Sequence, residues 1–211
     1  MTPPVLDNLP DLALIRPGRV HEATGAGRRT FAAALAGRLA GPVLWLQERR
    51  ERDQLCPQGL ATFFDPARLV LARPTGGRAL LQMAEEALRS GAAALVVAEL
   101  AEAPDLTQSR RLQIAASASA GGRSGPKELP RGLCLVPEGR TRSNAAETRW
   151  HCSPAPPACG GDGHTRLLWE LVKNKRGQLG CWEVVLDEGT ATTASRAPKM
   201  EREPHAAPTH A

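Results

Sequence analysis

The spacing of apolar and polar positions changes from segment to segment along this chain. Some segments have a pattern typical of strands and others a pattern typical of helices. Short apolar runs, bounded by glycine, proline or charge, predict buried strands; these lie at residues 19–24, 41–47, 68–74, 93–100 and 132–139. Apolar residues at helical spacing, or polar runs between strands, predict helices at residues 28–40, 51–61, 77–92 and 105–122. Strands that alternate with helices predict an α/β fold: a doubly wound, mostly parallel sheet flanked by helices.

The pattern changes in the last third of the chain. Residues 147–153 predict one more strand, and residues 165–187 predict two strands around a glycine-containing turn. We expect antiparallel strands at this C-terminal side of the sheet. The sequence therefore predicts an N-terminal extension at residues 1–17, an α/β domain at residues 18–187 and a disordered tail at residues 188–211, where periodicity is lost.

Composition narrows the class of protein. An apolar fraction of 42% and a charged fraction of 23% are typical of a globular domain. The five cysteines include no C-x-x-C pair, and no apolar run approaches the roughly 20 residues of a membrane span. We expect a cytoplasmic protein with no membrane partner. The formal charge of +5 permits a polyanionic partner without demonstrating one.

A group of histidines and cysteines resembles a metal site at first sight. Its members are His151, Cys152, Cys159 and His164. Structural zinc sites usually supply their ligands in tight pairs, whereas Pro154, Pro156 and Pro157 interrupt this group. We predict no metal.

The stretch "GRVHEATGAGRRTFAAALA" predicts a strand, a glycine turn and a helix, which is the layout of a phosphate loop. A working loop reads G-x-x-x-x-G-K-[ST], so that backbone N–H groups and a lysine hold the phosphates. Here the loop is shorter and lacks the lysine; its residues are Gly25, Gly27, Arg28, Arg29 and Thr30. Two interpretations stay open: the glycines make the turn only, or the arginines hold an anion at the helix N-terminus. We predict no ATP cofactor.

The order of these segments resembles the ImuA family, the RecA-like accessory proteins of bacterial damage-induced mutagenesis, and more distantly the RecA-type recombinase core. The resemblance covers residues 18–187 and is carried by "GRVHEATG", "GPVLWLQE", "EEALRSGAAALVVAEL", "TQSRRLQIAASA", "ETRWHCSP" and "LVKNKRGQLGCWEV". It implies a RecA-like sheet.

The resemblance also identifies what this chain lacks as an enzyme. Where recombinases end the central strand with a magnesium-linked aspartate, this chain has Ala98 followed by Glu99. Glu48 falls near the glutamate that holds the attacking water, but the chain has no tyrosine to stack on adenine. Phosphoryl transfer depends on correctly placed charges, so we predict no catalytic residues and no enzymatic activity.

Two basic groups are candidate contact sites for DNA or a protein partner. They are Arg140, Arg142 and Arg149, and Lys173, Lys175 and Arg176. The first group matches the position of DNA-contacting loops in recombinases; the second matches a motif that faces the neighbouring subunit's nucleotide. Ordinary surface charge and a solvated hairpin turn remain the alternatives for the two groups.

The function implied is that of a non-enzymatic adaptor in SOS mutagenesis. Such a protein would bring translesion polymerase components, meaning a Y-family-like polymerase homologue and an error-prone replicative-type polymerase, to damaged DNA or to a RecA filament. The alternatives are an active ATP-dependent recombinase relative and an SOS inhibitor of cell division.

Overall fold

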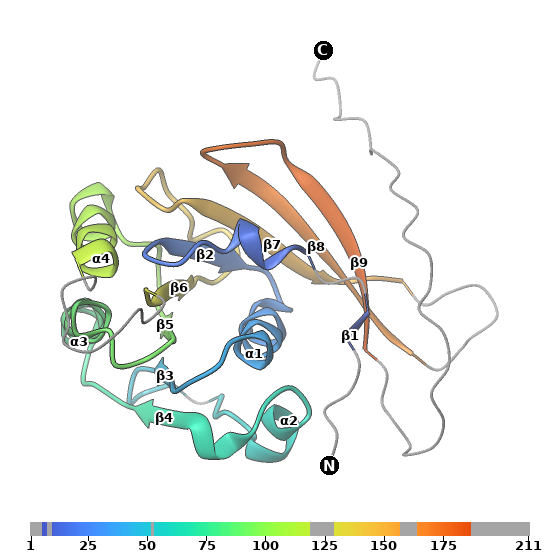
Figure 1. The fold of residues 1–211 in the computed structure, drawn as a ribbon, viewed down its shortest axis with the longest axis horizontal. Helices are drawn as coiled ribbons and strands as arrows, with labels where there is room; N and C mark the ends of the chain where they lie inside the picture. Colours follow the sequence, from blue (N-terminus) through green and yellow to red (C-terminus); the bar gives the residue numbers. More distant parts are fainter. Residues whose placement is uncertain (1–5, 8–9, 52, 119–128, 157–163, 187–211) are drawn as a thin grey trace.

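A nine-stranded sheet forms the centre of the protein, in the order β1-β9-β8-β7-β2-β6-β5-β3-β4 (Figure 1). The computed structural model describes residues 6–7, 10–51, 53–118, 129–156 and 164–186. The predicted tail at residues 188–211 lies outside the described residues.

The strands divide into a parallel and an antiparallel part. The parallel strands are β2 (Val20–Thr24), β3 (Val43–Leu46), β4 (Leu69–Ala72), β5 (Leu95–Glu99), β6 (Arg131–Leu135) and β7 (Thr148–Pro154). The antiparallel strands are β8 (Thr165–Asn174), β9 (Gly180–Leu186) and β1 (Leu6–Asp7). The predicted α/β fold, with antiparallel strands at its C-terminal side, is confirmed.

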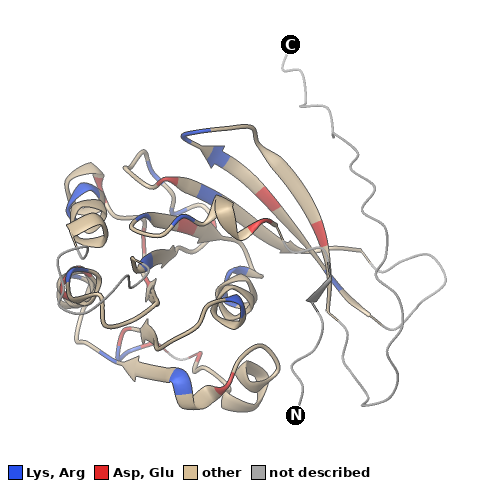
Figure 2. Ribbon diagram, viewed as in Figure 1, with Lys and Arg blue, Asp and Glu red and all other residues tan. Residues whose placement is uncertain are grey.

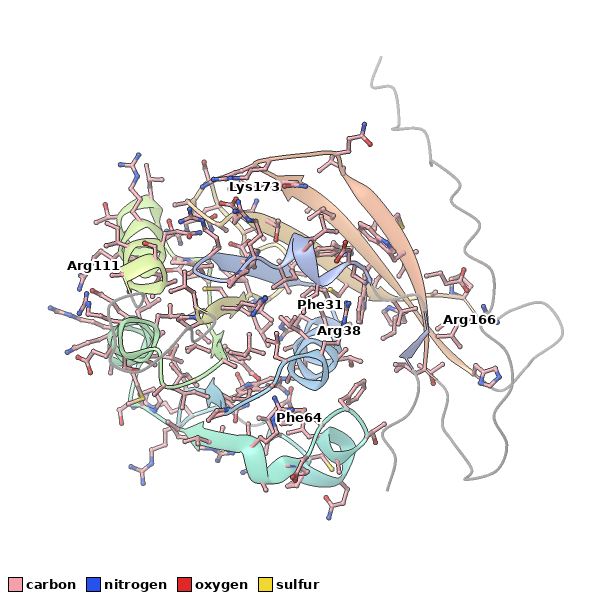
Figure 3. All side chains as sticks on the ribbon, viewed as in Figure 1. Phe31, Arg38, Phe64, Arg111, Arg166 and Lys173 are labelled. Carbon is pink, nitrogen blue, oxygen red and sulfur yellow. The ribbon has the colours of Figure 1, made fainter. Side chains whose placement is uncertain are left out.

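Helices cover both faces of the sheet. The first face carries α1 (Arg28–Arg38) and α2 (Pro57–Ala61), and the second carries α3 (Gly77–Ser90) and α4 (Leu106–Ala118) (Figure 1). Each face has its own apolar core. On the α1 face, Phe31 of α1 (labelled in Figure 3) packs against Trp150 and Trp169, with ring centroids 5.2 and 4.9 Å away. These aromatic contacts fasten α1 to the β7–β8 part of the sheet.

The helix predicted at residues 51–61 is much shorter in the structure. It begins only at Pro57, and the preceding residues form an irregular segment. Proline lacks an N–H and is well suited to the first helical turn, which explains this beginning. The described part of the helix predicted at residues 105–122 ends at Ala118, because residues 119–128 are outside the described ranges.

The segment before residue 18 takes part in the fold. Backbone pairing joins Leu6 to Leu186 and Asp7 to Val185, so that β1 borders β9. After the short 3-10 helix η1 (Leu12–Leu14), Ile15 is buried in the core of the α1 face. A second 3-10 helix, η2 (Pro66–Arg68), leads into β4.

Candidate functional site

The turn between β2 and α1 is built around two glycines. Gly25 has φ +85°, and a Cβ there would lie 2.2 Å from the carbonyl oxygen of Cys152 in β7. The N–H of Gly27 donates to the same carbonyl at 2.9 Å. The glycines therefore let the turn pack directly on β7, and an N–H beside the beginning of α1 is already used within the fold.

The arginines of the turn are also bonded within the protein. Arg28 Nη1 donates to the carbonyl of Gly25 at 3.0 Å. Arg29 makes a two-point contact with Glu99, from Nε to Oε1 at 3.0 Å and from Nη2 to Oε2 at 2.6 Å. Burial by itself disfavours the charge of Arg29, but the hydrogen bonds and the charge of Glu99 outweigh it and raise the pKa of Arg29. Thr30, the last residue of the predicted loop, lies half-buried in the first turn of α1.

Further buried polar groups hold Glu99 in this position. Trp45 Nε1 donates to Glu99 Oε1 at 2.7 Å, and both Trp45 and Gln47 are fully buried. Gln47 Nε2 donates to the carbonyl of Asp53 at 2.7 Å, and Arg29 Nη2 donates to that same carbonyl at 3.1 Å. We call Arg29, Trp45, Gln47 and Glu99 the Glu99 network. It ties α1, β3 and β5 together at the carboxyl end of the strands.

The two glutamates that the recombinase resemblance brings into consideration face different sides of the sheet. Glu99 points to the α1 face, toward Arg29. Glu48 lines a groove of about 780 Å³ between α3 and α4, next to Gly77, where an added Cβ would lie 3.3 Å from Glu48 Oε1. They do not converge on one point beside the glycine turn.

A second buried carboxylate, Glu22, organises the crossover from β6 to β7. Glu22 is 1% exposed and accepts hydrogen bonds from Arg149 Nε at 2.6 Å and from Asn144 Nδ2 at 2.5 Å. Lys173 Nζ donates to the carbonyl of Asn144 at 2.9 Å. We call Glu22, Asn144, Arg149 and Lys173 the Glu22 network. Partial burial and the charges of Arg149 and Lys175 lower the pKa of Lys173.

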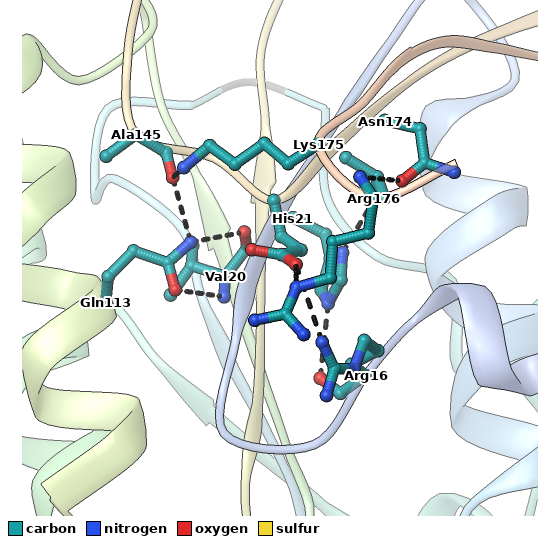
Figure 4. Close-up of polar contacts among 10 residues, drawn as sticks. Arg16, Val20, His21, Gln113, Ala145, Asn174, Lys175 and Arg176 are labelled. Carbon is teal, nitrogen blue, oxygen red and sulfur yellow. Dashed lines mark hydrogen bonds and ion pairs between the residues drawn. The ribbon is translucent and has the colours of Figure 1, made fainter. Parts of the chain in front are cut away.

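Residues of the β8–β9 turn make further contacts with the β6–β7 crossover (Figure 4). Lys175 Nζ donates to the carbonyl of Ala145 at 2.7 Å, and Arg176 Nε lies 3.2 Å from Glu147 Oε1. From α4, Gln113 Nε2 donates to the carbonyls of Val20 and Ala145 at 2.9 and 3.0 Å. The crossover is thus fastened from both the hairpin and the helix.

His21 lies next to Glu22 in β2 and is fully buried. Its Nδ1 is 2.7 Å from Thr148 Oγ1, and its Nε2 is 3.2 Å from the carbonyl of Arg16. The pKa of His21 is lowered to about 4, chiefly by burial; the hydrogen bond with the Arg16 carbonyl opposes this lowering, and the charges of Arg131, Arg16 and Arg19 add to it. His21 is therefore neutral at physiological pH.

The six predicted contact residues are not equally available. Arg149 is bonded to Glu22 and also donates to the carbonyl of Arg142 at 2.6 Å. Arg142 pairs with Glu102, whereas the exposed side chain of Arg140 makes no hydrogen bond or ion pair with another described residue. Trp150, the one aromatic residue near the first basic group, is fully buried and cannot stack on a base.

The structure separates the glycine turn from the β8–β9 turn. The glycine turn follows the carboxyl end of β2, whereas Thr148, the first residue of β7, pairs with Asn174 at the hairpin end of β8. The two predicted sites thus lie at opposite ends of the sheet. Figure 2 shows charges of both signs interspersed along the helices and strands rather than gathered on one element.

Neither network was predicted from the sequence. A signal was present for Glu22, because a carboxylate inside a short buried strand needs a partner. Nothing in the spacing of residues 22, 144 and 149 identifies those partners.

Two observations on the described residues concern metal binding and membrane spans. Within the described ranges, no group of three or more His, Cys, Asp or Glu side chains is arranged to hold a metal ion. Of the histidine and cysteine group, Cys152 is buried and Cys159 lies outside the described residues. No described helix has the length and apolarity needed to cross a bilayer.

Comparisons with known proteins give one clear relationship. No family model matches the sequence. The chain is 34% identical over 182 residues to Protein ImuA of Caulobacter vibrioides strain NA1000 / CB15N, covering 78% of this chain and 73% of that relative. The same values hold for Protein ImuA of C. vibrioides strain ATCC 19089 / CIP 103742 / CB 15. A solved structure, that of SulA from Pseudomonas aeruginosa, is 18% identical in sequence with a TM-score of 0.44. The match covers 56% of this chain and 97% of SulA.

Proposed function

This chain belongs to the ImuA family, and on that premise we propose that it is a non-enzymatic accessory protein of damage-induced mutagenesis. In this role it acts in the cytoplasm and brings translesion polymerase components to damaged DNA or to a recombinase filament. Its RecA-like sheet serves as a rigid scaffold for binding, without nucleotide chemistry.

The observation that carries the non-enzymatic part is the Glu99 network. Arg29, one of the two arginines that follow Gly27, is bonded through two of its nitrogens to Glu99. An anionic phosphate at this turn would have to compete with that carboxylate, whose side chain is only 9% exposed. Charge needed to stabilise a transferring phosphoryl group is thus neutralised within the protein.

The packing of the glycine turn supports the same proposal. A phosphate loop wraps its ligand with free backbone N–H groups. Here the N–H of Gly27 donates to Cys152, and the N–H of Arg28 to the carbonyl of Gly25 at 3.4 Å. The turn is filled by its own backbone contacts and by β7.

The non-enzymatic role and the role in mutagenesis are tested separately. The purified full chain is expected to show no ATP hydrolysis above background and no saturable binding of a fluorescent ATP analogue. Hydrolysis that is lost in the variant Arg29→Ala would overturn the non-enzymatic role.

For the cellular half, the gene is deleted from its host and mutation frequency is measured after ultraviolet damage. We expect the induced mutation frequency to fall to the uninduced level and to return with a plasmid copy. Unchanged induced mutagenesis, or filamentous cells on overexpression as the sole phenotype, would contradict the adaptor role and favour an inhibitor of cell division.

A further inference from the structure

The two edges of the sheet are treated differently by the fold. At one edge, β1 pairs with the end of β9. At the other edge lies β4, and within the described residues β3 is the single strand that pairs with it (Figure 1). The outer side of β4 therefore presents backbone N–H and C=O groups that no described strand uses.

The side chains of β4 are apolar and partly open to solvent. The strand reads Leu-Val-Leu-Ala; Val70 is 55% exposed and Leu71 is 39% exposed. Natural edge strands are commonly protected by a charged residue, a proline or a bulge within the strand, and β4 has none of these between Leu69 and Ala72. Such an edge is suited to the addition of another strand.

Available positive charge lies at the carboxyl end of β4. Arg73 follows the strand, and its Nε is buried without a hydrogen-bond partner among the described residues. The exposed Arg49 lies close by, because its backbone N–H donates to the carbonyl of Pro74 at 3.1 Å. At the other end, Arg68 is committed: its guanidinium donates to the carbonyl of Gly41 at 2.8 Å and to that of Ala36 at 3.1 Å.

We propose that the β4 edge binds an extended segment of another protein by strand addition. The segment carries two adjacent apolar residues, one on each face of the added strand, which cover Val70 and Leu71, and an aspartate or glutamate that reaches Arg73. Backbone hydrogen bonds to β4 supply affinity, and the apolar and acidic positions supply specificity.

A second copy of this chain does not fit the edge in the register that pairs the whole of β4. In a two-fold antiparallel pairing of β4 with itself, Leu69 would oppose Ala72 of the other copy. Arg68 would then oppose the other copy's Arg73, and like charges directly opposite in a sheet are destabilising.

The chain's own remaining sequence does not fit the edge either. Residues 1–5, 8–9, 119–128, 157–163 and 187–211 contain no two adjacent large apolar residues. Strand addition over both Val70 and Leu71 needs such a pair, because these two neighbouring side chains lie on opposite faces of the sheet.

The inference rests on the β4 edge alone and is independent of the proposed function, so the two can fail separately. The full chain is expressed in its host with a photo-crosslinking amino acid in place of Leu71. A matched chain carries it in place of Ile114, an exposed apolar residue of α4 that is 64% exposed. Crosslinked residues are mapped by mass spectrometry, with and without DNA damage.

We expect position 71 to crosslink to one segment of another protein, with two adjacent apolar residues near an aspartate or glutamate. Crosslinks to a second copy of this chain, crosslinks to residues 187–211, the same products as position 114, or no product would each overturn the proposal.

The mapped segment is then synthesised as a labelled peptide, and its binding to the full chain is measured by fluorescence anisotropy. Leu71→Lys and Arg73→Ala should each raise the Kd about tenfold or more. The control Ile114→Lys should change it by less than about twofold. Thermal melting of each variant establishes that it is folded, and equal Kd values for wild type, Leu71→Lys and Arg73→Ala would contradict strand addition at β4.

Discussion

The Glu99 network and the Glu22 network are two versions of one arrangement, in which a buried carboxylate holds an arginine. Arg29 binds Glu99 at the carboxyl end of the strands, and Arg149 binds Glu22 on the opposite face, beside the β6–β7 crossover. The first closes a turn that resembles a ligand site. The second fastens a connection that has no helix of its own. The same kind of ion pair thus engages an arginine of the glycine turn in one place and fastens a strand connection in the other.

The partners around each carboxylate explain the difference. Glu99 is reached by Trp45 and Gln47, which are themselves parts of the core. Glu22 is reached by Asn144, whose own carbonyl accepts from Lys173. Loss of Glu22 therefore releases the crossover from several partners at once, whereas loss of Glu99 leaves most of the packing around Trp45 in place.

The largest expected effect separates the two carboxylates by stability. Glu22→Ala should lower the free energy of unfolding by about 3–5 kcal/mol, because it leaves the guanidinium of Arg149 partly buried and unpaired. Glu99→Ala should cost about 2 kcal/mol, because Arg29 can turn toward solvent while Trp45 Nε1 loses its acceptor. Urea unfolding followed by tryptophan fluorescence measures both.

A matched control is Glu183→Ala, which removes an exposed pair with Arg166. It should change the free energy of unfolding by less than about 1 kcal/mol. Equal destabilisation by Glu22→Ala and Glu99→Ala would show that the Glu22–Arg149 pair does not contribute more to the stability of the fold than the Glu99–Arg29 pair.

The next prediction concerns how the stability of the protein depends on pH through His21, the neighbour of Glu22 in β2. His21 has a pKa of about 4 when folded and the ordinary value of 6.5 when unfolded, so the unfolded chain binds more protons between these values. Stability from the neutral ring is complete above pH 6.5 and is lost as the pH falls toward 4, by about 3 kcal/mol in all. Urea unfolding at pH 7, 6, 5 and 4 measures this slope.

The variant His21→Gln isolates the contribution of the ring, since it cannot be protonated in this range. Its stability should fall less between pH 7 and 4 than that of wild type. Parallel slopes for the two proteins would show that other groups carry the acid dependence.

The smallest expected effect concerns DNA and distinguishes Arg140 from the arginines that are engaged in ion pairs. If DNA binds at the first basic group, Arg140→Ala should reduce the slope of log K against log salt by about 0.9, the value for one phosphate contact. Arg110→Ala, on α4, is the control and should leave the slope unchanged. Anisotropy titrations on a labelled duplex at several salt concentrations give the slopes; an unaltered slope for Arg140→Ala would remove this residue from the DNA-binding candidates.

Local patterns in the sequence were enough to predict most of the sheet and its helices. Buried parallel strands carry apolar runs such as "VLWL" and "LVVA", and α3 repeats apolar residues at helical spacing until Gly91 ends it in the left-handed conformation. These properties depend on neighbours within a few residues, so they are visible in one dimension. The same holds for the β8–β9 hairpin and its short turn.

The site depended on contacts between residues far apart in the chain. Arg29 and Glu99 are separated by 70 positions, and Glu22 and Arg149 by 127. The helix predicted at residues 51–61 was too long. The polar pattern of these residues does not reveal that the Asp53 carbonyl accepts hydrogen bonds from Gln47 and Arg29, which hold it outside a helix. The sequence by itself determined which segments are strands and helices, since periodicity is local. Only the tertiary structure decided that Arg29 of the glycine turn faces the carboxylate of Glu99, because that depends on which side chains the folded sheet brings together.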